Sequence, residues 1–234
     1  MAVTHLKPTA LQTFEIYCPP SERGGDYDFQ SVMACSMALE KSGDIHGACE
    51  MRYQAFQRIF DMIPEKEEIE LEWDEDNTRA AMMVINSSAI DHFLIGDWEM
   101  CAGMLEFLLE LDPEDHMEAT IRLAYSYLAL EEYDLFDEVI NDVSEKHPDK
   151  LILSLWSEFR RAGRFIDGDL IRFKRRFTPY YDEFTAEQHP VDGAYLTEIE
   201  KDRPAREALA RETWLQTEHL WQLFPGFIEA LKTA

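Results

Sequence analysis

Glycine and proline are scarce in this chain, with ten of each among 234 residues. An all-β chain with many tight turns needs more of both, because these residues supply the special backbone angles of turns. The scarcity therefore favours a helical fold. Hydrophobic residues make up 46% and charged residues 29% of the sequence, a balance typical of folded globular proteins rather than of disordered chains.

Long apolar runs are also missing. The longest candidate, residues 80–90, is eleven residues long and is interrupted by Asn86, Ser87 and Ser88, whereas a membrane-spanning helix needs about 20 apolar residues. The first residues show no basic segment followed by an apolar core, which a secretory signal requires. We therefore expect a cytoplasmic protein that does not enter a membrane.

Basic residues are few, since Asp and Glu number 47 against 22 Lys and Arg, a formal charge of −25. Because nucleic-acid binding depends on positive charge, this balance argues against a general nucleic-acid binder. The cysteines, Cys18, Cys35, Cys49 and Cys101, form no C-x-x-C pair and lie near no histidine at zinc-finger spacing. We expect free and mostly buried thiols in a reducing compartment.

Motifs for catalysis and metal binding are missing as well. No histidine follows a Glu three residues earlier, and there is no H-E-x-x-H, G-x-S-x-G or glycine-rich phosphate loop. Residues 74–77 lack the glycine and the final glutamate of a calcium loop. The sequence predicts no cofactor, no metal and no enzymatic activity, and His92 is expected to be a packing residue.

What the chain does contain is a recurring turn between helical segments, at 41–45, 94–98, 130–134 and 161–165. Apolar residues recur every three to four positions on either side of these turns, which is the helical period. Gly43, Gly96 and Gly163 fit the left-handed backbone that follows many helices. Asp44 and Asp97 come next and can cap the following helix.

The spacing of these turns indicates a repeat. Gly43 and Gly96 are 53 residues apart, and the next two intervals are 35 and 32 residues, close to the period of paired-helix repeats. The longer first interval contains residues 65–76, which hold eight acids and one base. We interpret this segment as a solvated acidic insertion. The alternative is a docking site for a basic partner, and Trp73 in its middle favours a packing role.

Residues 82–149 resemble two tetratricopeptide (TPR) repeats, which are 34-residue helix–turn–helix units. The matching residues are Ala89, Cys101, Leu105, Leu108 and Pro113 in the first unit, and Leu123, Ala124, Tyr127, Tyr133, Ile140, Val143 and Pro148 in the second. In the family pattern each proline ends the second helix. Phe136 stands where a small residue is expected. Weaker matches cover 30–64 and 150–179, where Trp156 replaces a small residue.

The resemblance implies an all-α fold: a right-handed superhelical stack of TPR-like helix–turn–helix repeats with about ten to twelve helices and a C-terminal capping helix near 204–224. Residues 1–30 are expected to form an irregular arm with at most a short helix at 9–17. Residues 31–177 would form the repeat array, with the acidic insertion near 65–76. Residues 178–234 would form a loop, or a short broken helix, followed by capping helices.

In TPR proteins the first helix of each unit lines a concave surface that commonly binds an extended peptide. The resemblance places eleven residues there: Met83, Asn86, Ile90, Phe93, Glu118, Ile121, Tyr125, Leu128, Leu153, Ser157 and Arg160. Recognition of a chaperone tail is not expected, because Asn86 and Ile90 stand where the family's carboxylate clamp has Lys and Asn. The alternative is that half or more of the eleven residues belong to the core.

One basic stretch interrupts the acidic chain, since residues 150–177 hold eight bases and three acids. Within it, Arg172, Lys174, Arg175 and Arg176 cluster beside Phe173 and Phe177. These bases are candidates for binding a phosphate, an acidic peptide or a nucleic-acid backbone. We favour the other interpretation, in which they pair with nearby acids and the phenylalanines belong to the core.

The sequence thus leads us to expect a non-catalytic scaffold that binds a protein or peptide through the concave face. One alternative is a binder of anionic ligands or nucleic acid that acts through residues 172–176. The other is a structural protein that associates with a second copy of itself.

Overall fold

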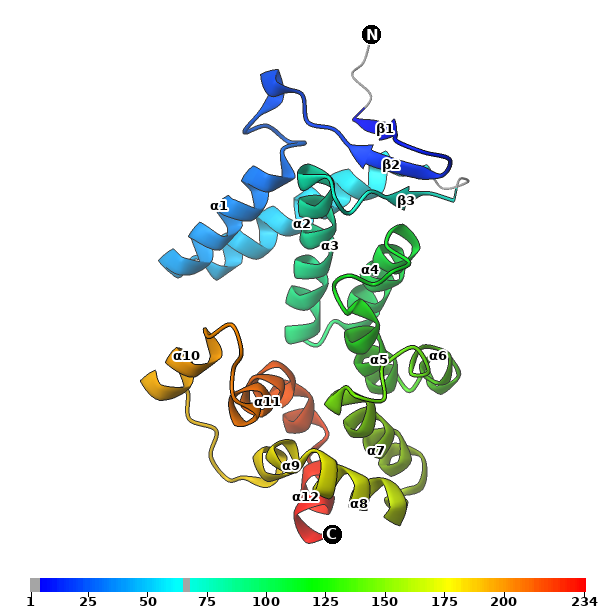
Figure 1. The fold of residues 1–234 in the computed structure, drawn as a ribbon, viewed down its shortest axis with the longest axis vertical. Coiled ribbons are helices and arrows are strands. Elements are labelled where there is room, and N and C mark those ends of the chain that lie inside the picture. The colour runs from blue at the N-terminus through cyan, green and yellow to red at the C-terminus, as the bar shows by residue number, and fades with distance from the viewer. Residues whose placement is uncertain (1–4, 65–67) are drawn as a thin grey trace. The chain divides into compact units, whose positions relative to one another are not determined.

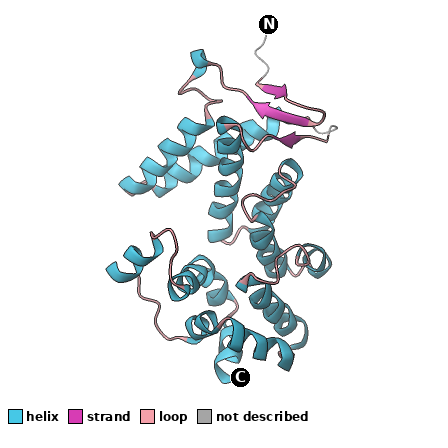
Figure 2. Ribbon diagram, in the orientation of Figure 1, coloured by secondary structure: helices cyan, strands magenta, loops and turns pink. Residues whose placement is uncertain are grey.

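The computed structural model describes residues 5–64 and 68–234, and helices dominate it (Figure 1; Figure 2). In these ranges it contains twelve α-helices, one 3-10 turn (Pro20–Glu22) and three short strands. The expectation of a mostly helical protein is confirmed. The chain divides into two compact units, Met1–Ser126 and Tyr127–Ala234, and α5 (Ala119–Leu130) crosses the boundary.

Two helix hairpins make up most of the first unit. The first hairpin pairs α1 (Phe29–Ser42) with α2 (Ile45–Met62), and the second pairs α3 (Asp76–Leu94) with α4 (Trp98–Leu111). Helix α3 also packs against both α1 and α2 (Figure 1). Nine residues of α3 are buried, so it is the central helix. Consecutive hairpins therefore hide apolar surface that an isolated hairpin would expose to water.

The turns within the two hairpins have the same geometry. Gly43 and Gly96 adopt φ angles of 88° and 80°, which an L-residue with a side chain rarely adopts. The next residues, Asp44 and Asp97, accept hydrogen bonds from the backbone N–H groups three residues later. The predicted combination of a left-handed glycine and a capping aspartate is confirmed at both turns.

The two later turns and the two prolines differ in detail. Glu131 takes the left-handed angle (φ 63°) in the third turn, and Gly163 takes it (φ 67°) in the fourth. Pro113 follows the end of α4, as predicted. The prediction for Pro148 is wrong, because this residue begins α7 (Pro148–Ala162) instead of ending a helix. The first helical position suits proline because its missing N–H would have no helical partner there.

The N-terminal segment forms strands, so the short helix predicted at 9–17 is wrong. Strand β1 (Leu6–Pro8) pairs antiparallel with β2 (Thr13–Ile16), and β2 pairs parallel with β3 (Glu70–Leu71). Gln12 adopts a φ angle of 68° in the turn between β1 and β2. Ile16 is buried, and its backbone N–H donates to Thr78 Oγ1 in α3 over 2.8 Å. The segment is thus fastened to the helices by backbone pairing.

The acidic insertion is in part packed against the protein. Residues 65–67 lie outside the described residues, but Ile69 and Leu71 are buried and Leu71 belongs to β3. The Trp73 ring stacks on the His116 ring, with centroids 4.5 Å apart and planes 6° apart. Trp73 therefore has the packing role that its size indicated.

A buried arginine joins three helices of the first unit. The side chain of Arg52 in α2 is 5% exposed. Its Nε and Nη2 each donate to an oxygen of Asp91 in α3 over 2.8 Å, and its Nη1 donates to Glu40 in α1. Burial opposes the charge, but Asp91 and Glu40 outweigh burial and raise the pKa of Arg52 above its ordinary value. The guanidinium therefore stays charged between the helices.

The second unit has an aromatic core. Its remaining helices are α6 (Tyr133–Val139), α7, α8 (Asp167–Arg176), α9 (Thr178–Thr185), α10 (Gly193–Ile199), α11 (Arg206–Leu223) and α12 (Pro225–Thr233). Helix α11 coincides with the predicted helix near 204–224, and it packs on α9, α10 and α12. Trp156 of α7 is fully buried, with the Trp221 ring 5.1 Å away in an edge-on arrangement. A large ring thus fills the space where the TPR pattern has a small residue.

Candidate functional site

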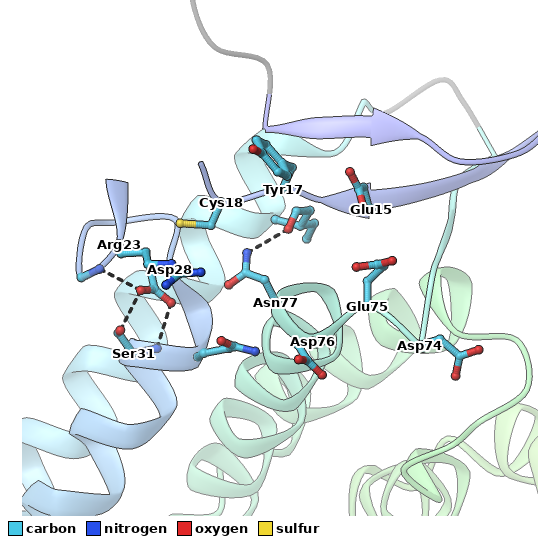
Figure 3. A pocket seen from close by; sticks show the side chains of 13 residues that line it. Glu15, Tyr17, Cys18, Arg23, Asp28, Ser31, Asp74, Glu75, Asp76 and Asn77 are labelled. Carbon is cyan, nitrogen blue, oxygen red and sulfur yellow. Dashed lines mark hydrogen bonds between the residues drawn. The ribbon is translucent and has the colours of Figure 1, made fainter. Parts of the chain in front are cut away.

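A polar pocket of about 790 Å³ lies in the first unit, where the end of β2, the loop before α1 and the start of α3 meet (Figure 3). Its lining consists of Glu15, Ile16, Tyr17, Cys18, Arg23, Gly24, Asp28, Gln30, Ser31, Asp74, Glu75, Asp76 and Asn77. Five of these thirteen residues are acidic and one is basic. The pocket therefore favours cationic groups over anionic ones.

Asn77 forms the frame of this pocket. Its Nδ2 donates to the backbone oxygens of Ile16 and Tyr27 over 2.8 and 3.0 Å, and its Oδ1 accepts from the backbone N–H of Phe29 over 2.8 Å. One side chain in the first turn of α3 thus holds the end of β2 and the start of α1. These bonds use its hydrogen-bonding groups for structure.

Asp28, the buried carboxylate of the pocket, also has a structural role. It accepts from the backbone N–H of Gly24 over 2.7 Å and from the N–H and Oγ of Ser31 over 3.1 and 2.7 Å. Burial opposes its ionisation, but these hydrogen bonds outweigh burial and hold the pKa of Asp28 below its ordinary value. Asp28 is therefore an ionised cap for α1 whose acceptor oxygens are occupied.

The other groups of the pocket do not form a reactive centre. Asp74, Glu75 and Asp76 are exposed at its rim, and Asp76 pairs with Arg79. Burial, together with Asp28 and Glu22, raises the pKa of the Cys18 thiol, which disfavours the thiolate. In the described parts of the chain, no three His, Cys, Asp or Glu side chains group as metal ligands. The arrangement offers a polar recess with acidic walls.

The residues predicted to line a concave groove fall into two sets. The accessible set, at least partly exposed, contains Met83, Asn86, Ile90, Glu118, Ile121 and Arg160. The buried set contains Phe93, Tyr125, Leu128, Leu153 and Ser157. Phe93 contacts the Tyr125 ring at 6.3 Å, and the Arg122 guanidinium lies 5.4 Å from the Phe93 ring. Within the first unit, the accessible part of the predicted groove consists of Met83, Asn86 and Ile90 on α3, together with Glu118 just before α5 and Ile121 on α5.

Of the predicted anion-binding residues, two have polar partners, and the Arg176 guanidinium lies 5.3 Å from the centre of the Phe177 ring. Arg172 pairs with Asp169, and Lys174 Nζ donates to the backbone oxygen of Ala234 over 3.1 Å. Arg175 and Arg176 are exposed at the end of α8. Phe173 and Phe177 are buried, as the core interpretation of this stretch requires. Anion binding by Arg175 and Arg176 stays a prediction.

The remaining sequence expectations about single side chains have mixed outcomes. His92 is a packing residue, as expected, because its Nδ1 lies 3.0 Å from Asp97 Oδ2 and its ring lies 5.5 Å from the Tyr53 ring. All four cysteines are free, but only Cys101 is buried and Cys35 is exposed. The expectation of mostly buried thiols is therefore wrong.

A second groove, of about 870 Å³, escaped the sequence analysis. It is lined by Phe60 and Asp61 at the end of α2, Ile63 and Pro64 after it, Glu68, Ile69 and Glu70 around β3, and Phe107, Glu110 and Leu111 on α4. Phe60 and Phe107 are 47 positions apart in the chain, and their rings meet at 5.2 Å. The spacing of Phe56 and Phe60 along α2 was the local signal that an aromatic surface continues to the end of this helix.

Within the described residues, no helix has both the length and the apolar character that crossing a bilayer requires. Comparison of this chain with protein-family models, curated proteins and solved structures finds no match.

Proposed function

We propose that this chain is a non-catalytic, cytoplasmic scaffold that binds a protein or peptide through the concave face of a TPR-like array. The single observation that carries the proposal is the arrangement of α1 to α4. Two hairpins share the same glycine–aspartate turn, and the first helix of the second hairpin packs on both helices of the first. Packing each hairpin on the one before it is the principle of helical repeat proteins, which use the resulting surface to bind partners.

The accessible residues on α3 support a binding face there. Met83 is 36% exposed, and Asn86 and Ile90 are partly exposed. A flexible thioether, an amide and a branched aliphatic chain, spaced three and four residues apart, lie on one side of a helix. Such a mixture of adaptable apolar surface and one hydrogen-bonding group suits an extended peptide.

The test compares two lysine substitutions of equally exposed methionines. Met83→Lys places a charge on the proposed face, whereas Met100→Lys, at a position 37% exposed on α4, adds the same charge elsewhere. The full chain and both variants serve as bait, and the recovered proteins are quantified. We expect one protein to be recovered by the parent and by Met100→Lys and to be lost with Met83→Lys. The reasoning is refuted if the two variants recover the same proteins in the same amounts.

The same two variants also test the alternative, in which the face on α3 binds a second copy of this chain. If light scattering shows a dimer that Met83→Lys dissociates and Met100→Lys preserves, the face is a contact between two copies. The scaffold proposal then fails in favour of self-association.

A further inference from the structure

The groove between α2, β3 and α4 has an apolar floor and aromatic walls. Ile69 and Leu111 are 5% and 2% exposed, whereas Phe60 is 51% exposed. The Phe60 ring contacts the rings of Phe107 and Phe56 at 5.2 and 6.0 Å. Leaving half of a phenylalanine side chain in water forgoes hydrophobic stabilisation, and phenylalanine is among the aromatic residues enriched at protein–protein interfaces.

The rim of the same groove is acidic. Asp61, Glu68, Glu70 and Glu110 line it, and all four are exposed. No lysine or arginine is found among the described residues of its lining. Among the rim carboxylates, Glu68 accepts a hydrogen bond from Gln12 Nε2 over 3.4 Å. Four negative groups therefore surround an apolar surface, and the part of its lining that the structure describes supplies no cation to balance them.

These features together select the partner by charge. We propose that this groove binds a cationic amphipathic segment of another protein, one that packs large apolar side chains against the rings of Phe60 and Phe107 and sets lysines or arginines against the rim. The formal charge of −25 attracts such a segment from a distance. The same charge opposes a second copy of this chain as the occupant, because two copies repel each other.

The apolar surface and the acidic rim of the groove contribute differently to binding. Contact with Phe60 and Phe107 supplies the hydrophobic gain, while the rim determines which apolar segments approach. A helix with apolar residues three and four positions apart presents such a stripe between basic flanks. An anionic segment of equal hydrophobicity would meet like charges on the rim and bind far more weakly.

The experiment uses the full chain and a fluorescent amphipathic helical peptide made of leucine and lysine. Binding is followed by anisotropy at physiological salt. Two comparison peptides have glutamate in place of lysine, or the same leucines and lysines scrambled so that no apolar face forms. We expect the amphipathic cationic peptide to bind at least about tenfold more tightly than either. Equal binding of the scrambled peptide means plain charge attraction and overturns the proposal.

Matched variants separate the groove from the general negative charge. Asp61→Asn combined with Glu68→Gln, Glu70→Gln and Glu110→Gln neutralises the rim, and the control neutralises four exposed acids elsewhere, Glu99, Glu138, Asp142 and Glu187. We expect the rim variant to lose about tenfold or more in affinity and the control to lose less than about threefold. Equal losses of affinity in the rim variant and the control would show that the peptide does not bind in this groove.

A second pair of variants tests the floor. Phe60→Ala should weaken binding about tenfold, whereas Ile45→Ala, 55% exposed at the start of the same helix, should leave it unchanged. Circular dichroism verifies that each variant is folded. If the chain alone dimerises and Phe60→Ala abolishes the dimer, the occupant is a second copy and the proposal falls. No residue is shared between this groove and the proposed face on α3, so the failure of one leaves the other standing.

Discussion

Arg52 offers a quantitative test of how the first unit is held together. Its guanidinium, 5% exposed, faces Asp91, which is 17% exposed, and Glu40, which is 41% exposed. Arg52→Ala leaves two carboxylates between α1, α2 and α3 without their cation. Breaking a buried ion pair by removing one partner typically destabilises a protein by about 3–5 kcal/mol, and we expect this range for Arg52→Ala.

The two carboxylates should differ in what they contribute. Asp91 receives two hydrogen bonds from the guanidinium, and losing bonds to a charged group costs roughly 1.5–3 kcal/mol. We therefore expect Asp91→Asn to cost about 2–3 kcal/mol. Because solvent screens the more exposed Glu40, Glu40→Gln should cost only about 0.2–1 kcal/mol. The double variant Arg52→Ala with Asp91→Asn should cost less than the sum of the two single changes, because both remove the same contact.

Hydrogen exchange measured by mass spectrometry reports these costs locally. Amides of α1, α2 and α3 should lose protection in the order Arg52→Ala, Asp91→Asn, Glu40→Gln, while those of α11 serve as an internal reference. Urea unfolding followed by circular dichroism gives the change in the free energy of unfolding. The reasoning is refuted if Arg52→Ala costs less than about 1 kcal/mol, or if Glu40→Gln costs as much as Asp91→Asn.

Three further predictions follow from single side chains. Gly96→Ala, at φ 80°, should destabilise the protein by about 1 kcal/mol, whereas Gly103→Ala, at an open position in α4, should stabilise it by about 0.5–1 kcal/mol. Urea unfolding measures both changes in the free energy of unfolding, and changes of the same sign would contradict this prediction. The hydrogen bond to Asp112 raises the pKa of His116, so this pair stabilises the fold at low pH and the effect is lost as pH rises through that pKa. An NMR titration should show a lower midpoint in Asp112→Asn, and an unchanged midpoint contradicts the assignment. Burial raises the pKa of Cys101 to about 11, so at pH 8 iodoacetamide should modify exposed Cys35 well before Cys101, as peptide mapping can show. Equal rates would contradict the burial.

Local sequence was sufficient where structure depends on neighbouring residues. The turns at Gly43 and Gly96 were predictable because one residue must adopt a left-handed angle and the next must cap a helix, and both requirements act within a few positions. The helical period of apolar residues likewise indicated α3 and α4. The position of Pro148 was ambiguous, since proline is tolerated both after a helix and at the start of the next.

Tertiary contacts decided what local patterns left open. The strand at Thr13–Ile16 pairs with Leu6–Pro8 and also with Glu70–Leu71, more than fifty residues away, and backbone pairing over such a distance leaves little trace in a short sequence window. The same holds for the meeting of Phe60 with Phe107. The TPR resemblance placed Phe93 on the groove-lining face of a helix, but only packing against Tyr125 and Arg122 decided that Phe93 is buried while Met83 remains accessible. Periodicity is an intrachain property, whereas burial depends on which surfaces meet after folding.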